Sequence, residues 1–215
     1  MSTPSEQLSE PAAALRAGAP RPLLSQTAEG RLGRRHREVL DQLESLFLSQ
    51  GFAAFTVRRL AAGVGCSRRT LYELAPSKDQ LVLLVLDRFL HRIGRRALAA
   101  IHPDSPVVDQ IRQYVTGGID LQLQASAFAD DLADDPAARR LLDRHFRYVM
   151  TVIERLVGLG IERGEMRPVN PPVVAGTIAG SALYMTQPDV VAGIGLRREA
   201  LVDELLDFLL PSLIR

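Results

Sequence analysis

The chain has 215 residues, of which 47% are hydrophobic and 24% charged, and its formal net charge is +1. This length and apolar content allow a sizeable core, so they exclude wholesale disorder. The single cysteine, Cys66, excludes an internal disulfide framework and is compatible with a reducing cytoplasm. The longest uncharged run, residues 169–188, is interrupted by prolines and glycines. We therefore expect no membrane span and a cytoplasmic protein.

Residues 1–30 are rich in alanine, serine and proline and show no apolar periodicity, which predicts a flexible N-terminal arm. Four prolines and the lack of a continuous apolar stretch argue against a secretory signal. Arg16 and Arg21 could let the arm touch DNA, but an inert tail is the favoured interpretation because chain ends are usually loose. Cys66 is interpreted as a small buried hydrophobe rather than a redox switch.

A first helix is expected from about residue 31 to residue 50, where Gly51 ends it. Its buried face would carry Val39, Leu43, Leu46 and Phe47. The basic residues at its start, which include Arg34 and Arg35, are either a solvated charge run or phosphate contacts. We place phosphate contact slightly ahead because of the motif that follows.

The stretch 56–81 has the pattern of two short helices around a tight turn. Apolar residues at 57, 60, 61 and 64 predict a helix of about two turns, with Thr56 as its cap. Gly63 and Gly65 supply the backbone freedom for the turn, and Ser67 can cap a second helix. This is a helix-turn-helix, whose second helix enters the DNA major groove. The candidate DNA-contacting residues carry guanidinium, hydroxyl, ammonium or aromatic groups, which can meet bases and phosphates. They are Arg34, Arg35, Thr56, Arg58, Ser67, Arg68, Arg69, Thr70, Tyr72 and Lys78.

The charge distribution agrees with this interpretation. Residues 31–78 hold nine arginines and lysines against four acids, whereas residues 79–215 hold 15 basic against 18 acidic residues. A basic head joined to a mildly acidic body is typical of a DNA-binding module linked to a second function.

The same stretch resembles the DNA-binding domain of TetR-type bacterial regulators, whose pattern is Gly-Val-Ser-x-x-Thr-Leu-Tyr-x-x-Phe-x-Ser-Lys-x-x-Leu. The matching residues are Gly65, Ser67, Thr70, Leu71, Tyr72, Ser77, Lys78 and Leu81. Two positions depart from it: Cys66 replaces a small aliphatic residue, and Ala75 replaces an aromatic residue under the recognition helix. We expect Leu74 or Pro76 to fill the gap at Ala75 and the recognition helix to dock differently from the family average. The resemblance covers about residues 31–89, and only the helical layout carries over beyond it.

Further helices are expected from Lys78 to about residue 100, over 107–124, from 136 to about 163, over 171–185 and from 198 to about 213. The predicted fold is all-α, with a three-helix DNA-binding domain (31–77), a helical ligand-binding and dimerisation domain (78–215) and about nine helices in total.

A cluster of four carboxylates raises the question of a metal site; its members are Asp130, Asp131, Asp134 and Asp135. We favour a helix start instead, with Asp135 as the cap and Pro136 in the first turn.

Small residues on one face of the helix 171–185, Gly176 and Gly180 among them, allow either close core packing or a subunit interface. The helix from 198 offers the apolar residues Leu201, Leu205 and Phe208. The resemblance implies that the last two helices form the bundle of a homodimer, so we predict the interface there.

An effector site is predicted from polar tips that lie among aliphatic residues of the helical body. The candidates are Tyr114, Gln122, His145, Tyr148, Val149 and Tyr184. The resemblance implies a small organic effector whose binding changes the separation of two DNA-reading heads; the residues do not identify its class. The resemblance also favours a repressor over an activator.

Two other functions were weighed. An enzyme is disfavoured because the sequence has no phosphate-binding glycine loop, nucleophile elbow, metalloprotease motif or dinucleotide fingerprint. No catalytic residue, cofactor or metal is therefore predicted. A helical scaffold that has lost DNA binding is suggested by Ala75, but the retained Arg68, Arg69, Tyr72 and Lys78 argue against it.

Overall fold

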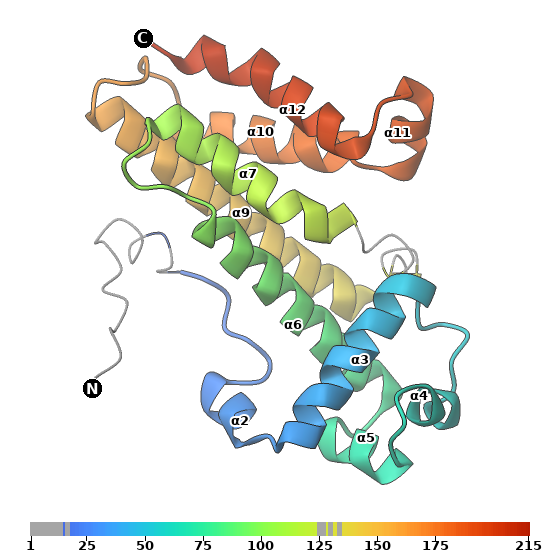
Figure 1. Cartoon of the computed structure of the whole chain (residues 1–215). Coiled ribbons are helices and arrows are strands. Elements are labelled where there is room, and N and C mark those ends of the chain that lie inside the picture. The colour runs from blue at the N-terminus through green and yellow to red at the C-terminus, as the bar shows by residue number, and fades with distance from the viewer. Residues whose placement is uncertain (1–14, 16–17, 124–127, 129–130, 133–134) are drawn as a thin grey trace. The chain divides into compact units, whose positions relative to one another are not determined.

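The computed structural model describes residues 15, 18–123, 128, 131–132 and 135–215, whose regular elements are helices joined by turns and loops (Figure 1). One isolated β-bridge joins Met166 and Ile214. The predicted all-α class is confirmed. The elements are α2 (Gln26–Arg31), α3 (Arg34–Gln50), α4 (Val57–Gly63), α5 (Arg68–Leu74), α6 (Lys78–Ala99), α7 (Val107–Leu123), α9 (Pro136–Glu162), α10 (Pro171–Met185), α11 (Pro188–Ile194), α12 (Arg198–Leu209) and the 3₁₀ turn η1 (Leu210–Leu213).

The chain divides into two compact units. The described residues of 20–93 and 121–145 form one, here called the head unit; those up to 19, 94–120 and 146–215 form the other, the body unit. Helices α6 and α9 each contribute residues to both units. We keep residues 31–77 as the proposed DNA-binding domain and 78–215 as the proposed ligand-binding and dimerisation domain.

The core of the head unit is built on α3. Val39, Leu43 and Phe47 are fully buried there, as predicted, while Leu46 is only partly buried. The apolar run at the start of α6 packs into the same core, led by Leu81 and residues 82–86. Each large aliphatic side chain removed from water in this way contributes about 1.5–3 kcal/mol before the entropic cost of folding. Three aromatic rings meet in this core, those of Phe47, Phe52 and Phe128, with centroids 5.6–5.8 Å apart.

Helix ends fall where the sequence supplies caps. Thr56 Oγ1 accepts a hydrogen bond from Arg59 N at 3.3 Å, and Ser67 Oγ accepts one from Thr70 N at 3.0 Å. Asp135 Oδ1 accepts from the amides of residues 137 and 138 at 2.7 and 3.1 Å, which confirms its predicted role as a cap. Gly51 ends α3 with a φ of +68°, a conformation that costs glycine little.

Two helices were not predicted. Helix α2 lies inside the segment 1–30 that the sequence predicts to be a flexible arm, and Ser25 caps it by accepting from Ala28 N at 3.2 Å. The second, α11, lies in the expected loop and ends at Gly195 in the left-handed conformation. Both are short, so neither shows an apolar period, and α2 is tied down by contacts with α6 described below. Arg16, which could let the arm touch DNA, lies outside the described residues.

The body unit contains α7, the second part of α9, and the pair α10 and α12, which pack against each other. Gly160 lets the chain after α9 cross closely, because a Cβ there would lie 2.7 Å from Met166 Sδ. Arg112 on α7 pairs with Asp207 on α12 at 2.6 Å. Within the described ranges, no helix is both long and apolar enough to cross a bilayer.

Candidate nucleic-acid interface and effector site

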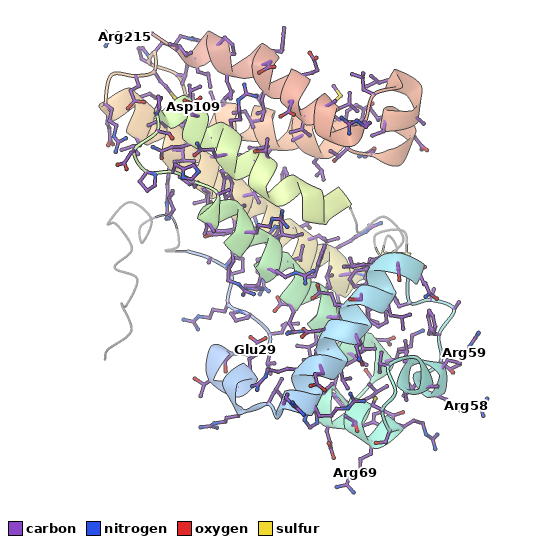
Figure 2. The ribbon with its side chains drawn as sticks, viewed as in Figure 1. Glu29, Arg58, Arg59, Arg69, Asp109 and Arg215 are labelled. Atoms are coloured by element: carbon purple, nitrogen blue, oxygen red, sulfur yellow. The ribbon has the colours of Figure 1, made fainter. Side chains whose placement is uncertain are left out.

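The second helix of the motif, α5, presents charged and aromatic side chains to solvent. Arg68, Arg69 and Tyr72 are exposed, Tyr72 by 53%, whereas Leu71 on the opposite side is buried in the head core. On the neighbouring α4, Arg58 and Arg59 are also exposed; Figure 2 shows both, with Arg69, pointing away from the ribbon. The buried face fixes α5 in place, so its polar face is available to a partner.

Glu73 organises part of this surface. Arg69 Nε donates to its Oε1 at 3.0 Å, and His36 Nε2 on α3 lies 3.1 Å from its Oε2. These two hydrogen bonds hold the pKa of the Glu73 carboxyl below its usual value. Arg69 is therefore oriented along α5 by its own helix, whereas α5 is tied to α3 through His36.

Arg35 has a role that the sequence did not predict. Its guanidinium donates to Gly65 O at 2.6 Å and to Val64 O at 3.4 Å, so it fastens α3 to the turn between α4 and α5. Gly65 has a φ of +58° there. Arg34 instead remains exposed and pairs weakly with Glu38 at 3.4 Å. Sequence spacing could not separate these two neighbours, because the turn that Arg35 reaches lies about 30 residues away.

Lys78 lies in the first turn of α6, whose start is capped by Ser77 Oγ at 3.2 Å from Gln80 N. Its Nζ donates to Ala53 O at 3.3 Å and lies 5.7 Å from the centroid of the Phe52 ring. Asp131 holds the same loop by accepting from the backbone amides of Phe52 and Ala53, the latter at 2.8 Å. Lys78 is thus oriented before any partner binds, and Asp131 acts in the loop rather than in a metal site.

The two departures from the family pattern are accommodated in the core. Ala75 is buried at the end of α5, and Leu74 packs partly against the same core, as expected, whereas Pro76 is exposed. Cys66 is half-buried against this core, and burial raises the pKa of its thiol despite the opposing charge of Arg35. The thiol is therefore neutral, in line with its interpretation as a small apolar residue.

Two of the six candidate effector residues come together in the body unit. Tyr114 is 2% exposed, and its hydroxyl has no hydrogen-bond partner among the described atoms. Burial, and secondarily Tyr148, raises the pKa of the Tyr114 hydroxyl. Tyr148 is also buried, but its hydroxyl donates to Leu15 O at 3.1 Å. A buried hydroxyl without a partner is costly, which marks Tyr114 as a place where a ligand atom would be stabilising.

The other four candidates are placed differently. His145 belongs to the head unit, where burial and then His91 lower its pKa to about 4. Val149 is half-buried on α9, and the side chain of Gln122 lies outside the described residues. Tyr184 is 57% exposed on α10, so it does not line an interior site. Alternation of polar and apolar residues could not distinguish these faces because α9 and α10 each have several neighbours.

The predicted interface residues fall into two groups. Phe208 on α12 is 80% exposed, and Gly180 on α10 faces open space. In contrast, Leu201 is buried within the chain, Leu205 is half-buried, and a Cβ at Gly176 would lie 3.6 Å from Met150 Cε. Leu201 and Gly176 therefore serve internal packing first. Further exposed apolar residues of α10 are Val173, Leu183 and Tyr184, the last of which was a candidate for the effector site rather than for the interface.

In the part of the chain that is described, no group of three or more His, Cys, Asp or Glu residues could hold a metal ion. The exposed arginines lie on a short, firmly packed helix-turn-helix, an arrangement typical of DNA-binding modules. Residues 39–85 match the family of bacterial regulatory proteins called the tetR family. The match shows that this segment is similar to the DNA-binding region of tetR-family proteins.

One curated relative is the uncharacterised HTH-type transcriptional regulator YvaF of Bacillus subtilis strain 168. It is 43% identical over 54 residues, which make up 25% of this chain and 28% of the relative. The match thus spans little more than a quarter of that protein's length.

Solved structures share the fold over most of the chain. AibR in complex with isovaleryl coenzyme A and operator DNA is 20% identical, with a TM-score of 0.61, and the match covers 83% of this chain and 99% of AibR. NemR of E. coli in its reduced form is 16% identical, with a TM-score of 0.69 over 85% of this chain and 98% of NemR. A putative TetR-family regulator from Rhodococcus sp. is 15% identical, with a TM-score of 0.68 over 83% and 100%.

Proposed function

We propose that this chain is a sequence-specific DNA-binding regulator that acts as a homodimer and represses transcription from a near-palindromic operator. The observation that carries the proposal is α5, a capped helix whose buried Leu71 fixes it while Arg68, Arg69 and Tyr72 remain exposed. Arginine is the side chain that most often reads guanine in the major groove. Arg34, Arg58, Thr56, Ser67, Thr70 and Lys78 are proposed to contribute further base or phosphate contacts.

The dimer is proposed to form through the exposed faces of α10 and α12. Phe208, Tyr184, Leu183 and Val173 expose large apolar surfaces there, which are costly to leave in water on a monomer. Two copies related by a two-fold axis would present their recognition helices to grooves about 34–36 Å apart. That spacing is the reason to expect an operator with two half-sites.

The effector is proposed to be a small apolar or amphipathic molecule that carries a hydrogen-bond acceptor or donor for Tyr114. Its hydroxyl is buried without a partner and close enough to Tyr148 for their charges to interact. The structure of AibR with both isovaleryl coenzyme A and operator DNA gives one example of this fold holding an organic ligand and DNA. Binding would release the operator by changing the separation of the two heads.

Selection of operators from a random DNA pool by the full-length protein tests DNA recognition. Enrichment of a near-palindrome is expected, and Arg68→Ala should broaden the selected sequence. No enrichment over the input pool would contradict the proposal.

A thermal-shift screen of lipophilic compounds, followed by operator titration with each hit, tests the effector. A bound effector is expected to change the affinity for the operator by about 5–150-fold. Stabilising compounds that never alter operator affinity would contradict an effector-controlled switch.

A further inference from the structure

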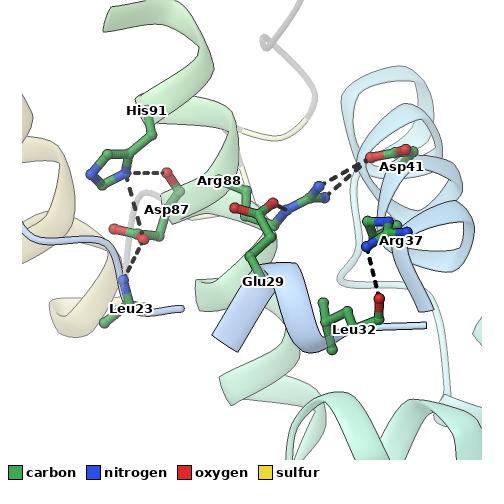
Figure 3. A network of polar contacts seen from close by, with 8 residues as sticks. All are labelled: Leu23, Glu29, Leu32, Arg37, Asp41, Asp87, Arg88 and His91. Carbon is green, nitrogen blue, oxygen red and sulfur yellow. Dashed lines mark hydrogen bonds and ion pairs between the residues drawn. The ribbon is translucent and has the colours of Figure 1, made fainter. Parts of the chain in front are cut away.

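The segment from Pro20 to Arg31 is held against α6 by three polar contacts within the head unit. Leu23 N donates to Asp87 Oδ2 at 2.7 Å, and Arg88 Nε donates to Glu29 Oε1 at 3.1 Å (Figure 3). His91, one turn further along α6, places its Nε2 2.9 Å from Pro20 O. The segment is therefore anchored at both of its ends rather than lying loose on the surface.

The centre of this anchor is Asp87, which is only 1% exposed. Besides Leu23 N, its carboxylate accepts from Arg144 Nη2 of α9 at 2.9 Å, and His91 Nδ1 lies 3.5 Å from it. Arg88, next to it on α6, also reaches Asp41 of α3 at 3.2 Å. A buried carboxylate is tolerated when charged and hydrogen-bonded partners surround it, so removal of any one donor is costly.

The ring of His91 lies between two acceptors. Its Nδ1 is 2.8 Å from the backbone oxygen of Asp87, and its Nε2 is 2.9 Å from the backbone oxygen of Pro20. A carbonyl oxygen can only accept, and a neutral imidazole carries a single N–H. Both hydrogen bonds can form together only when the ring is protonated at both nitrogens. Loss of that proton leaves one of the two carbonyl contacts unmade.

Groups from α6 and α9 face the ring of His91. Asp87 supplies a negative charge from the same helix, and Arg144 from α9 reaches that carboxylate on its other oxygen. His145, also on α9, is the remaining titratable neighbour, and its pKa is lowered to about 4, first by burial and then by His91. His145 is therefore uncharged from about pH 5 upward and does not repel the His91 imidazolium in the range where histidines ordinarily titrate.

We propose that His91 is a proton-dependent latch that fastens the segment Pro20–Arg31 to α6. The protonated ring holds Pro20 and supports Asp87, which holds Leu23; the neutral ring releases one of these contacts. The latch is closed when both ring nitrogens carry a proton and loosens when one proton is lost, so a rise in pH can only loosen it. This regulation requires neither DNA nor an effector, so it stands apart from the proposed function.

Hydrogen exchange of the Leu23 amide, measured by NMR on the free full-length protein at pH 6.0 and pH 8.0, tests the latch. After correction for intrinsic exchange, the protection factor should fall about tenfold or more at the higher pH, the scale of one charge-assisted hydrogen bond. The variant His91→Gln should show no such difference. His102→Gln, which removes an exposed histidine of the body unit, should behave like the wild type.

Equal protection of Leu23 at both pH values in the wild-type protein would overturn the proposal, and this comparison needs no variant to fold. A pH difference that persists in His91→Gln would also overturn it, because another group would then be responsible. Neither result bears on operator binding, so failure of the latch and failure of the proposed function can be told apart.

Discussion

The two units of this protein expose opposite kinds of side chain on their prominent helices. In the head unit, α4 and α5 expose four arginines and bury three apolar residues; these are Arg58, Arg59, Arg68 and Arg69 against Leu60, Ala61 and Leu71. In the body unit, α10 and α12 expose Val173, Tyr184 and Phe208. Guanidinium groups are matched to a polyanion, whereas aromatic and aliphatic groups are matched to another apolar surface.

The contrast shows that the surface of each unit, rather than its core, distinguishes its role. Both units bury aliphatic residues in the same manner, and both use capped helices. Removal of the exposed groups of one unit should therefore impair that unit's role and leave the other unit intact.

The largest effect is expected from Phe208→Glu. A charge placed in the centre of an apolar interface costs about 2–4 kcal/mol or more per site, so the dimer should dissociate at micromolar concentration. Sedimentation velocity measures this directly, and operator affinity should fall with it. Asp203→Asn, an exposed change on the same helix, is the matched control and should remain dimeric. If the Phe208→Glu protein still sedimented as a dimer, the dimer interface would have to lie elsewhere.

A smaller effect is expected from Arg68→Ala, which should cost about 1–3 kcal/mol at the preferred operator and relax the preference for one base pair. Lys78→Ala should instead weaken binding to all DNA and reduce the salt dependence by about one ion. Titrations of operator and non-specific DNA over a series of salt concentrations separate the two. If Lys78→Ala altered base preference and Arg68→Ala altered only the salt slope, the two roles would be interchanged.

The half-buried His145 is expected to make stability depend on pH. Its pKa of about 4 in the folded protein lies below that of a histidine in an unfolded chain, about 6.5. The unfolded chain therefore binds the proton first as the pH falls, and the stabilisation present above about pH 6.5 is lost between there and pH 4. The loss should be about 1–3 kcal/mol in urea unfolding experiments. His145→Gln should show a flatter profile; an unchanged profile would assign the dependence to other groups.

The smallest effects are expected from two tyrosine variants whose changes in stability should have opposite signs. Tyr114→Phe removes a buried hydroxyl without a partner and should stabilise the free protein by about 1 kcal/mol, whereas Tyr148→Phe loses a hydrogen bond to Leu15 and should destabilise it by a similar amount. Thermal unfolding of the two variants measures both. Tyr114→Phe should also weaken stabilisation by effector hits. Equal destabilisation by both changes would mean that Tyr114 already has a partner.

Predictions from the sequence hold where residues within a few positions of one another determine the structure. Helices α4, α5 and α10 begin at Val57, Arg68 and Pro171 as predicted, because caps and prolines act within a few residues. The cap at Asp135 and the helix stop at Gly51 were predicted for the same reason. The burial of Leu201 within the chain, in contrast, depends on the packing of neighbouring helices, which a local pattern does not reveal.

The candidate site shows the same division. The exposure of Arg68, Arg69 and Tyr72 follows from the position of Leu71 on the opposite face of a single helix. The role of Arg35 and of Asp131 depends on backbone groups about 30 and 80 residues away, which no local pattern indicates. Helix α2 was missed because contacts with Asp87 and Arg88, rather than an apolar period, hold its segment.

The most direct test of the central claim is a gel-shift titration of the full-length protein on the intergenic DNA beside its own gene. The account predicts a discrete complex at nanomolar protein, two chains for each near-palindromic site, resistant to excess non-specific DNA and weakened by Arg68→Ala. Binding that excess non-specific DNA removes completely, or that Arg68→Ala leaves unchanged, would contradict the assignment of α5 as the helix that reads the operator.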